Sequence, residues 1–370
     1  MRVLHVHEAS TGGVVSYLRE LATEQVRRGH DVHVLAPTRS MAAGVHQHDW
    51  GLVRRRPGSY PRAVNELART VRTVGPDVIH LHSFWAGLFG RLPAPRRGTA
   101  ATVYQPHSWS AQRFDNPLYT RLLWAVERGA SRRTHALVAN CADEVDEGRR
   151  GGVRTPAYAL GIPLDIERFT PADADARQRF RLQLGMSGVH MLLCLGRLGR
   201  QKGQDLLVAA WERAPVPGSE LVLVGAGDVA ALRALAPRQW GKTVRVVANQ
   251  DDVRPWIWAS DVLVVPSRYE GMSVAVAEAL ACGRPVVAGG VNGAAEAVAD
   301  PPLPPAGAVV PRGDMDSLLD EAARRLRDPA LWEAESAQAR CRAEQQYTPA
   351  AVVDRLELAY AGAADRRLDS

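Results

Sequence analysis

The sequence predicts an α/β protein made of two parallel-sheet domains, and three observations support this. Short runs rich in Val and Leu alternate with longer amphipathic segments from end to end, which is typical of βαβ units. The series occurs twice along the chain. The 370 residues, 46% of them hydrophobic, are enough for two separate buried cores.

The first series contains a helix between its first two strands. Val14, Leu18, Leu21 and Val26 recur there at helical spacing, and Gly29 stands where a helix C-cap is expected. The candidate strands of this series are 2–6, 31–35, 77–81, 100–104 and 135–139.

The second series begins near residue 190 and predicts a second Rossmann-like domain. Its candidate strands are 190–196, 220–224, 243–247, 261–265, 285–288 and 307–310. Between the two series, residues 161–176 mix prolines and charges with little periodicity, which indicates a linker. We therefore expect domains at 1–165 and 166–347, with a helix at about 348–370 crossing back onto the first domain.

Cysteine usage and hydropathy point to a soluble cytoplasmic protein. The four cysteines lie far apart and form no metal-ligand spacing, so we expect reduced core thiols with neither zinc nor disulfide. No stretch approaches the roughly 20 apolar residues of a membrane span, and the first apolar run is too short for a signal peptide.

Positive charge gathers in the first half of the chain. Residues 1–170 hold 23 Arg and no Lys against 15 Asp and Glu, a net +8. One explanation is a genome that favours Arg over Lys. The alternative is that Arg54, Arg55 and Arg56, with Arg62 nearby, face an anionic membrane or an acidic acceptor. The arginines are not interleaved with stacking aromatics, so no nucleic-acid partner is expected.

The most informative segment is residues 261–288. A buried strand ends at Pro266, a loop carries Glu270, and a helix begins near Ser273. The free N–H groups at that helix start would suit a diphosphate. Glu278 lies about 7.5 Å further along the helix axis, a distance that suits ribose hydroxyls.

Glu270 leaves the loop on the other side of the phosphates, where a transferable sugar would lie. The alternative is that Glu278 is a solvated helix residue and Glu270 a surface charge. Arg197 and Lys202 follow the strand at 190–196, where they could clamp a departing diphosphate.

These segments resemble the retaining glycosyltransferases of family 4, which have the GT-B fold of two Rossmann-like domains facing each other across a deep cleft. The resemblance covers nearly the whole chain and rests on EGMSVAVAE, GRLGRQKG, STGGVVSYLRELATEQVRRGHDVHVLAP, PDVIHLHSFWAGLFGR and LVLVGAGD. The chain departs from the family at Asn292, where a diglycine is common, and at Ala248 and Asn249 near the base pocket.

The resemblance implies roles for named residues. Arg197 and Lys202 would bind the diphosphate, Glu278 the ribose and Glu270 the donor sugar. The backbone of Gly271, Met272 and Ser273 would assist at the sugar end, and the diglycine Gly12 and Gly13 would let donor and acceptor approach the backbone. His107, just past a strand, would contact the donor sugar and the reacting region, and we do not assign it as a general base. The residues so implied in catalysis are His107, Arg197, Lys202 and Glu270.

The implied reaction moves a hexosyl-type sugar from a nucleotide diphosphate sugar, with a UDP-sugar favoured over a GDP-sugar, to an acceptor hydroxyl. Anomeric configuration would be retained through front-face transfer, without metal or other cofactor, and the DAD at 173–175 is interpreted as loop or helix start. The acceptor would be a small molecule, a glycan or a glycolipid, met by the first domain in the cytoplasm or at the inner membrane face. Trp109 and Phe114 would either stack on it or pack within their loop. The alternatives are a nucleotide-sugar epimerase and a non-catalytic nucleotide-sugar binder.

Overall fold

The computed structural model describes residues 1–37, 41–54, 56–91 and 100–368, so Arg55 lies outside the described residues. The chain divides into two compact units. Unit 1 is Met1–Pro163 with Pro349–Ser370, and unit 2 is Leu164–Thr348.

Unit 1 is built on a seven-stranded parallel sheet in the order β3-β2-β1-β4-β5-β6-β7. Its strands are β1 (Arg2–His7), β2 (Asp31–Ala36), β3 (His46–Asp49), β4 (Val78–His82), β5 (Ala101–Gln105), β6 (Ala136–Ala139) and β7 (Ala157–Ala159). Its α-helices are α1 (Gly13–Arg27), α2 (Tyr60–Val74), α3 (Ser83–Gly90), α4 (Pro117–Ser131), α5 (Ala142–Arg150) and α14 (Pro349–Leu368). Short 3₁₀ turns lie at η1 (Pro57–Ser59) and η2 (Ser110–Arg113).

The two edge strands of this sheet, β3 and β7, were not expected from the sequence. β3 reads His-Gln-His-Asp and has no buried residue, so it offers no apolar alternation. The five expected strands are present, each within one residue of its predicted bounds. The first helix also ends as predicted, because Gly29 takes a positive φ of 82° and its N–H donates to the Val26 carbonyl at 2.9 Å.

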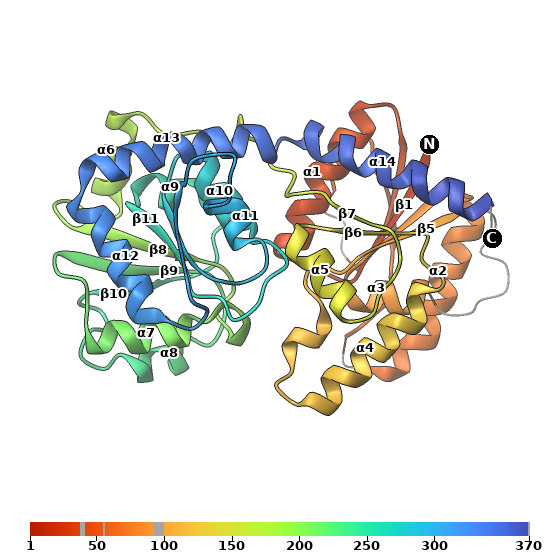
Figure 1. The fold of residues 1–370 in the computed structure, drawn as a ribbon, viewed down its shortest axis with the longest axis horizontal. Helices are drawn as coiled ribbons and strands as arrows, with labels where there is room; N and C mark the ends of the chain where they lie inside the picture. The colour runs from red at the N-terminus through yellow and green to blue at the C-terminus, as the bar shows by residue number, and fades with distance from the viewer. Residues whose placement is uncertain (38–40, 55, 92–99, 369–370) are drawn as a thin grey trace. The chain divides into compact units, whose positions relative to one another are not determined.

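Helix α14, drawn in blue in Figure 1, packs beside α1 and against β5, β6 and β7. Its inward side chains Val352, Val353, Leu356 and Tyr360 are at most 1% exposed. The last helix of the chain therefore completes the core of the unit that contains the N-terminus.

Unit 2 is built on a six-stranded parallel sheet in the order β10-β9-β8-β11-β12-β13. Its strands are β8 (His190–Leu195), β9 (Ser219–Val224), β10 (Val244–Val247), β11 (Val262–Val265), β12 (Val286–Gly289) and β13 (Gly307–Val310). Its α-helices are α6 (Ala174–Gln183), α7 (Gln204–Arg213), α8 (Val229–Leu235), α9 (Arg254–Ala259), α10 (Val274–Ala281), α11 (Ala294–Val298), α12 (Met315–Arg327) and α13 (Pro329–Gln346), with a 3₁₀ turn η3 (Arg200–Lys202).

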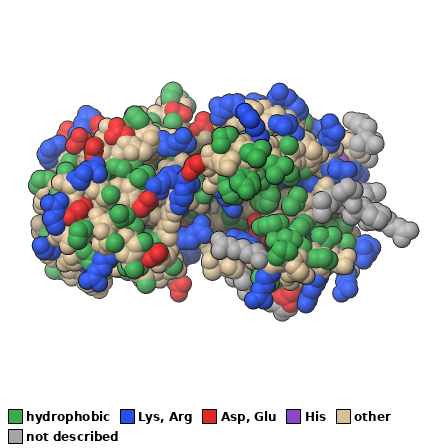
Figure 2. Space-filling model, turned by 90° about the horizontal axis from the view of Figure 1, so that it is seen from below, with side chains coloured by type: hydrophobic (Ala, Val, Ile, Leu, Met, Phe, Trp, Pro, Cys, Tyr) green, Lys and Arg blue, Asp and Glu red, His purple; other side chains and the backbone are tan. Residues whose placement is uncertain are grey.

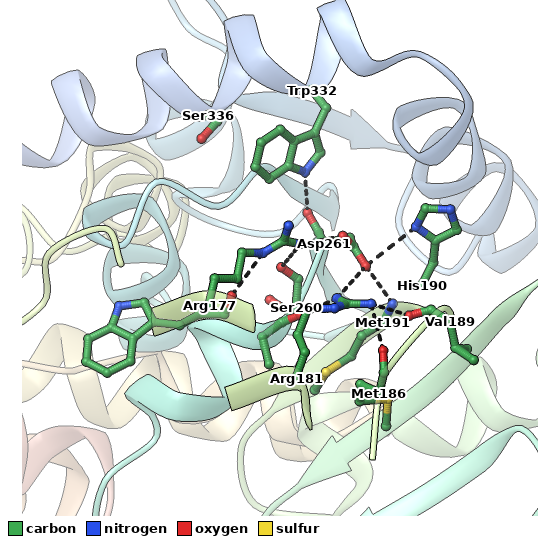
Figure 3. Close-up of polar contacts among 12 residues, drawn as sticks. Arg177, Arg181, Met186, Val189, His190, Met191, Ser260, Asp261, Trp332 and Ser336 are labelled. Atoms are coloured by element: carbon green, nitrogen blue, oxygen red, sulfur yellow. Dashed lines mark hydrogen bonds and ion pairs between the residues drawn. The ribbon is translucent and has the colours of Figure 1, made fainter. Parts of the chain in front are cut away.

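One residue, Asp261, connects two helices to the middle of this sheet through its carboxylate and its backbone carbonyl (Figure 3). It accepts from Arg177 at 2.5 Å and Arg181 at 3.2 Å, both on α6, and from the N–H of Met191 on β8 at 2.7 Å. The Trp332 indole of α13 donates to the backbone carbonyl of Asp261 at 2.7 Å.

The DAD segment at 173–175 is a helix start, because Asp173 caps α6 by accepting from the Ala176 N–H at 2.7 Å.

Two sequence expectations concern the whole chain. None of the four cysteines, all of which lie within the described residues, forms a disulfide, and Cys141, Cys194 and Cys282 are buried. Among the described helices, none combines the length and apolar character needed to cross a membrane.

Candidate functional site

The candidate residues of unit 2 follow two adjacent strands, β8 and β11, which pair in parallel through Leu192 and Leu193. From β8 the sheet continues to β9 and β10 on one side and to β11, β12 and β13 on the other. Loops leaving the carboxyl ends of strands at such a reversal diverge and make room for a ligand. Arg197 and Lys202 follow β8, and Glu270 follows β11.

The structure brings Lys202 and Glu270 into direct contact. The Lys202 ammonium lies 2.6 Å from Glu270 Oε1, which also accepts from the Ser267 hydroxyl at 2.8 Å. Glu270 is only 5% exposed. The interpretation of this residue as a surface charge is therefore wrong, since a buried carboxylate needs the partners it has found.

Arg197 joins this group through one glutamine. Its guanidinium donates to Gln201 Oε1 at 3.4 Å, and the amide nitrogen of Gln201 lies 3.4 Å from Glu270 Oε2. The Arg197 side chain is otherwise exposed. It is thus placed beside Lys202 with donors available to a ligand.

Glycine at position 203 allows the two loops to meet. Gly203 has a φ of 70°, and a Cβ there would lie 2.0 Å from the carbonyl oxygen of Pro266. The Arg268 guanidinium closes the same junction by donating to both carboxylate oxygens of Asp205, at 2.7 and 2.6 Å. The cationic and acidic groups are therefore carried by two loops in direct contact.

Helix α10 begins as predicted directly after this loop. Ser273 is its N-cap, yet its side chain makes no capping hydrogen bond. The first N–H groups of a helix have no partner within the helix, so this end can receive an anion. Gly271, Met272 and Ser273 are buried at this end of the loop.

Glu278 lies on α10 and is half-buried. Burial raises the pKa of its carboxyl to about 7, against the opposing charges of Arg168 and Lys202. Within the described residues no hydrogen bond to this side chain is found. A carboxylate on a helix whose first turn has no side-chain cap can accept hydrogen bonds from hydroxyl groups of a ligand.

In unit 1, the loop after β1 carries the predicted diglycine. Gly12 has a φ of 90°, a conformation that favours glycine, and α1 begins at Gly13. Both residues are exposed, and a Cβ on Gly12 would meet no atom within 4 Å. The backbone here is open to a ligand.

His107 follows β5 on a turn held in the left-handed region. Its φ is 51° and that of Ser108 is 88°. Glu144 secures this turn by accepting from the N–H of Ser108 at 2.5 Å and from that of Asn140 at 2.8 Å. Burial raises the pKa of the Glu144 carboxyl to about 7, although both N–H groups stabilise its charge.

The His107 ring is surrounded by polar and aromatic neighbours. Its Nε2 lies 3.0 Å from Nδ1 of His82, its Nδ1 lies 3.4 Å from the Asn140 amide nitrogen, and the Tyr17 ring stands edge-on at 4.9 Å. Burial lowers the pKa of His107 to about 3. The imidazole is therefore neutral at physiological pH.

Comparison with known proteins identifies the family. Residues 11–167 match the family model for Glycosyltransferase Family 4, and residues 189–328 match that for Glycosyl transferases group 1. The GDP-mannose-dependent alpha-(1-6)-phosphatidylinositol monomannoside mannosyltransferase of Mycolicibacterium smegmatis is 30% identical over 350 residues, 86% of either chain. The chain belongs to the family 4 glycosyltransferases. A further relative of this glycosyltransferase is the D-inositol 3-phosphate glycosyltransferase of Actinosynnema mirum, 29% identical over 330 residues and 78% of either chain.

Solved structures share the predicted GT-B fold. Sucrose-phosphate synthase from Thermosynechococcus elongatus superposes with a TM-score of 0.82 at 22% identity, covering 96% of this glycosyltransferase and 98% of that chain. Anabaena HepE in complex with UDP and glucose gives 0.80 at 18% identity, with coverages of 96% and 98%. The predicted fold class and the enzyme class are both confirmed.

Sequence reasoning missed several residues around the site of unit 1. Glu8, 7% exposed after β1, accepts from the N–H groups of Trp85 and Ala86 at the start of α3. Glu144, which holds the His107 turn, was also missed. Trp109 is 1% exposed and packs with its ring 5.1 Å from that of Trp124 on α4, so of its two interpretations packing is confirmed and stacking on an acceptor is not.

The histidines that neighbour His107 could have been found from two sequence segments. The segments HVH and HLH repeat histidine at the two-residue period of a strand, which places the rings on one face of the sheet. Glu144, however, has no local signal, because its role depends on β5 and β6 being neighbours.

Proposed function

We propose that this glycosyltransferase transfers a hexose from a UDP- or GDP-sugar to an acceptor hydroxyl with retention of anomeric configuration. The observation that carries the donor assignment is the contact of Lys202 with Glu270 next to the uncapped start of α10. Lys202, Arg197 and the helix N–H groups neutralise the diphosphate. Glu270 accepts hydroxyls of the sugar, and Glu278 accepts those of the ribose.

The proposed course of the transfer reaction follows from the charged groups at the donor site. No carboxylate of this group is assigned as a nucleophile on the far face of the sugar, so the acceptor hydroxyl attacks from the face that the diphosphate leaves. A leaving-group oxygen takes the proton. The protein stabilises the growing negative charge with fixed cations and N–H groups, and no metal is needed for this task.

The names of the relatives support a choice of substrates. The Mycolicibacterium relative is named for GDP-mannose and a phosphatidylinositol monomannoside, and the Actinosynnema relative for inositol 3-phosphate. We therefore propose an acceptor that carries a cyclitol, either free or within a glycolipid. UDP and GDP both remain in the proposal, because the HepE structure holds UDP.

A surface of unit 1 favours a membrane-bound acceptor. Phe114, Leu118, Tyr119 and Leu122 are 48 to 72% exposed along α4 and the turn before it. Figure 2 shows hydrophobic side chains gathered on unit 1, with basic side chains around them, which in this unit are all arginines. Exposed arginines of the same segment are Arg113, Arg121, Arg128, Arg132 and Arg133.

We propose that this face of α4 rests on an anionic bilayer, since apolar and basic side chains combine on interfacial helices. The arginines around residues 54–62 contribute less to membrane binding, because two of them already have protein partners. Arg54 donates to the Glu8 carbonyl at 2.9 Å, and Arg62 pairs with Glu66 at 2.7 Å. Vesicles with anionic lipid should retain the protein at low salt, and L118E/L122E should weaken this retention. The proposal would be refuted if neutral vesicles retained the protein as well as anionic ones do, or if anionic vesicles retained the double variant as well as the wild type.

The reaction is tested by NMR of the product. The purified chain is given UDP- and GDP-sugars with inositol phosphate acceptors, and the anomeric configuration of the product is read from its coupling constants. Retention with undiminished activity in chelator is expected. An inverted product, or activity that is lost in chelator and restored by manganese, would contradict the mechanism. If the donor alone were converted to an isomeric nucleotide sugar, the protein would be an epimerase. If no donor were turned over, it would be a non-catalytic binder.

A further inference from the structure

A row of buried polar side chains lies on one face of the sheet of unit 1. His5 and His7 on β1 stand opposite His80 and His82 on the adjacent strand β4. All four are completely buried. The face they occupy is covered by α1 and α14, the two helices that supply the remaining members of the row.

The row forms a continuous chain of hydrogen bonds that ends at His107. His107 Nε2 lies 3.0 Å from His82 Nδ1, and His82 Nε2 lies 3.0 Å from His5 Nδ1. His5 Nε2 lies 2.8 Å from the amide oxygen of Gln25 on α1. Two imidazoles, those of His5 and His82, therefore connect a helix glutamine to His107.

The chain continues beyond Gln25 to α14. The amide nitrogen of Gln25 donates to the Tyr360 hydroxyl at 3.4 Å, and this hydroxyl lies 2.9 Å from His80 Nδ1. Tyr360 thus receives one hydrogen bond and donates the next. These contacts orient the Gln25 amide, with its oxygen toward His5.

Each ring in this chain is neutral. Burial lowers the pKa of His5 to about 4 and holds those of His80 and His82 well below the usual value. A neutral imidazole has one N–H donor and one bare nitrogen acceptor. A proton on one ring of the chain therefore determines the tautomer of the next.

The direction of the chain follows from its glutamine end. Because the Gln25 oxygen can only accept, His5 must carry its proton on Nε2 and accept at Nδ1. His82 then donates from Nε2, which leaves its Nδ1 to accept from His107 Nε2. Nδ1 of His107 is consequently bare, in agreement with the amide nitrogen of Asn140 that faces it at 3.4 Å.

We propose that His5 and His82 are positioning residues for His107, which they hold as the tautomer with a bare Nδ1. This nitrogen, released from its long contact with Asn140, can accept a hydrogen bond from a ligand hydroxyl. The proposal rests on the proposed function and on the role of His107 as a sugar contact, which the resemblance to family 4 enzymes implies. It assigns His5 and His82 an effect on transfer although neither touches substrate.

A metal ion is the competing explanation for the cluster. His5, His80 and His82 each offer one nitrogen, and these three atoms lie within 4.8 Å of one another. The hydrogen-bond chain, however, already uses both nitrogens of His5 and of His82. A metal would have to replace at least one of these bonds.

The test uses ¹⁵N NMR of histidine-labelled full-length protein, with the His107 signals assigned by H107A. The wild type should show a protonated Nε2 and a bare Nδ1. H82Q should preserve this pattern, because an amide can accept from His107 and donate to His5. H82L and Q25M should instead give a mixture of tautomers at His107.

Transfer kinetics provide the second measurement. H82L and Q25M should lower kcat by roughly 10- to 100-fold, as expected for residues that fix the tautomer of a functional imidazole, while the KM for the donor changes less. H82Q should restore most of kcat. Q25M changes a residue of α1 and leaves all the histidines in place, so it can still test the proposal if H82L does not fold.

Three results would overturn the proposal: a protonated Nδ1 in the wild type, unchanged tautomer and kcat in both H82L and Q25M, or one equivalent of metal lost on H82L substitution. Failure of the proposed function is seen separately. A wild-type chain that transfers no sugar would refute that function, whereas the nitrogen signals would still decide the tautomer of His107.

Discussion

Lys202 holds Glu270 in the structure, and we assign the same ammonium to the departing diphosphate. Both groups lie on short loops fixed by Gly203 and by the ion pair of Arg268 with Asp205. When a donor binds, the ammonium can serve the phosphates and the carboxylate together. The residue therefore orders the site before the donor arrives and stabilises charge as the bond breaks.

Substitution of Lys202 by Met is expected to lower kcat by about 100- to 1,000-fold, because a fixed donor to the developing charge is lost. Steady-state kinetics with a saturating acceptor measures the effect. Lys242 is the only other lysine of the chain and is exposed, so K242M is the matched control and should behave as wild type. Equal activities of the two variants would remove Lys202 from the donor site.

Glu278 gives the donor site a dependence on pH. Burial raises the pKa of its carboxyl to about 7, so the group is mostly neutral below that pH and ionised above it. Ionised oxygens accept hydroxyl hydrogen bonds more strongly than a neutral acid. The affinity for a nucleotide sugar should therefore rise as the pH increases from 6 to 8.

Titration calorimetry with an unreactive nucleotide sugar, which has no terminal phosphate to titrate, measures this dependence. E278Q cannot ionise, so its affinity should be lower at pH 8 and nearly constant over the range. A wild-type affinity that falls with pH, or a Glu278 variant with the same slope as wild type, would rule out the ribose contact.

Residue types at the donor site could be predicted from sequence, but their partners could not. The spacing of Glu270 and Glu278 around a helix start is a local pattern, and the helix begins where expected. The contact of Glu270 with Lys202 spans 68 residues and exists because β8 and β11 are adjacent in the sheet. The burial of Trp109 likewise depends on Trp124, which lies on a different element.

At the scale of elements, α14 connects the end of the chain to the core of unit 1. One of its faces is buried against α1 and the sheet, and the other is exposed. Its Tyr360 also belongs to the hydrogen-bond chain that leads to His107. The helix therefore contributes both packing and one polar contact.

Two leucines on α14 provide a matched test of this packing. Leu356 is completely buried, whereas Leu358 is 67% exposed. L356A should lower the free energy of unfolding by about 3 kcal/mol, through lost burial and the cavity that remains. L358A should leave it nearly unchanged. Urea denaturation of both variants, followed by circular dichroism, measures the two free energies of unfolding. Equal losses of this free energy in L356A and L358A would contradict the packing described.

Elements with a strong hydrophobic pattern were predictable, and elements without one were not. The central strands read as Val- and Leu-rich runs because both of their faces are buried. The edge strands β3 and β7 have no fully buried residue, so no apolar pattern marks them. They form because a neighbouring strand offers unpaired backbone groups.

At the scale of the whole molecule, candidate residues of each unit follow strands at or beside the point where the strand order of its own sheet reverses. In unit 1 the strand order reverses between β1 and β4, which are followed by Gly12 and by the turn that begins α3, and His107 follows the neighbouring strand β5. In unit 2 it reverses between β8 and β11, which are followed by Lys202 and Glu270. The doubled βαβ series in the sequence predicted both sheets, and the strand order explains why the two sets of loops are suited to ligands.

A crystal structure of the full chain with UDP or GDP bound tests the donor site most directly. We expect the diphosphate within hydrogen-bond distance of the Lys202 ammonium and the first N–H groups of α10, with the ribose hydroxyls on Glu278. A nucleotide bound elsewhere, or a ribose remote from Glu278, would contradict the proposed donor site.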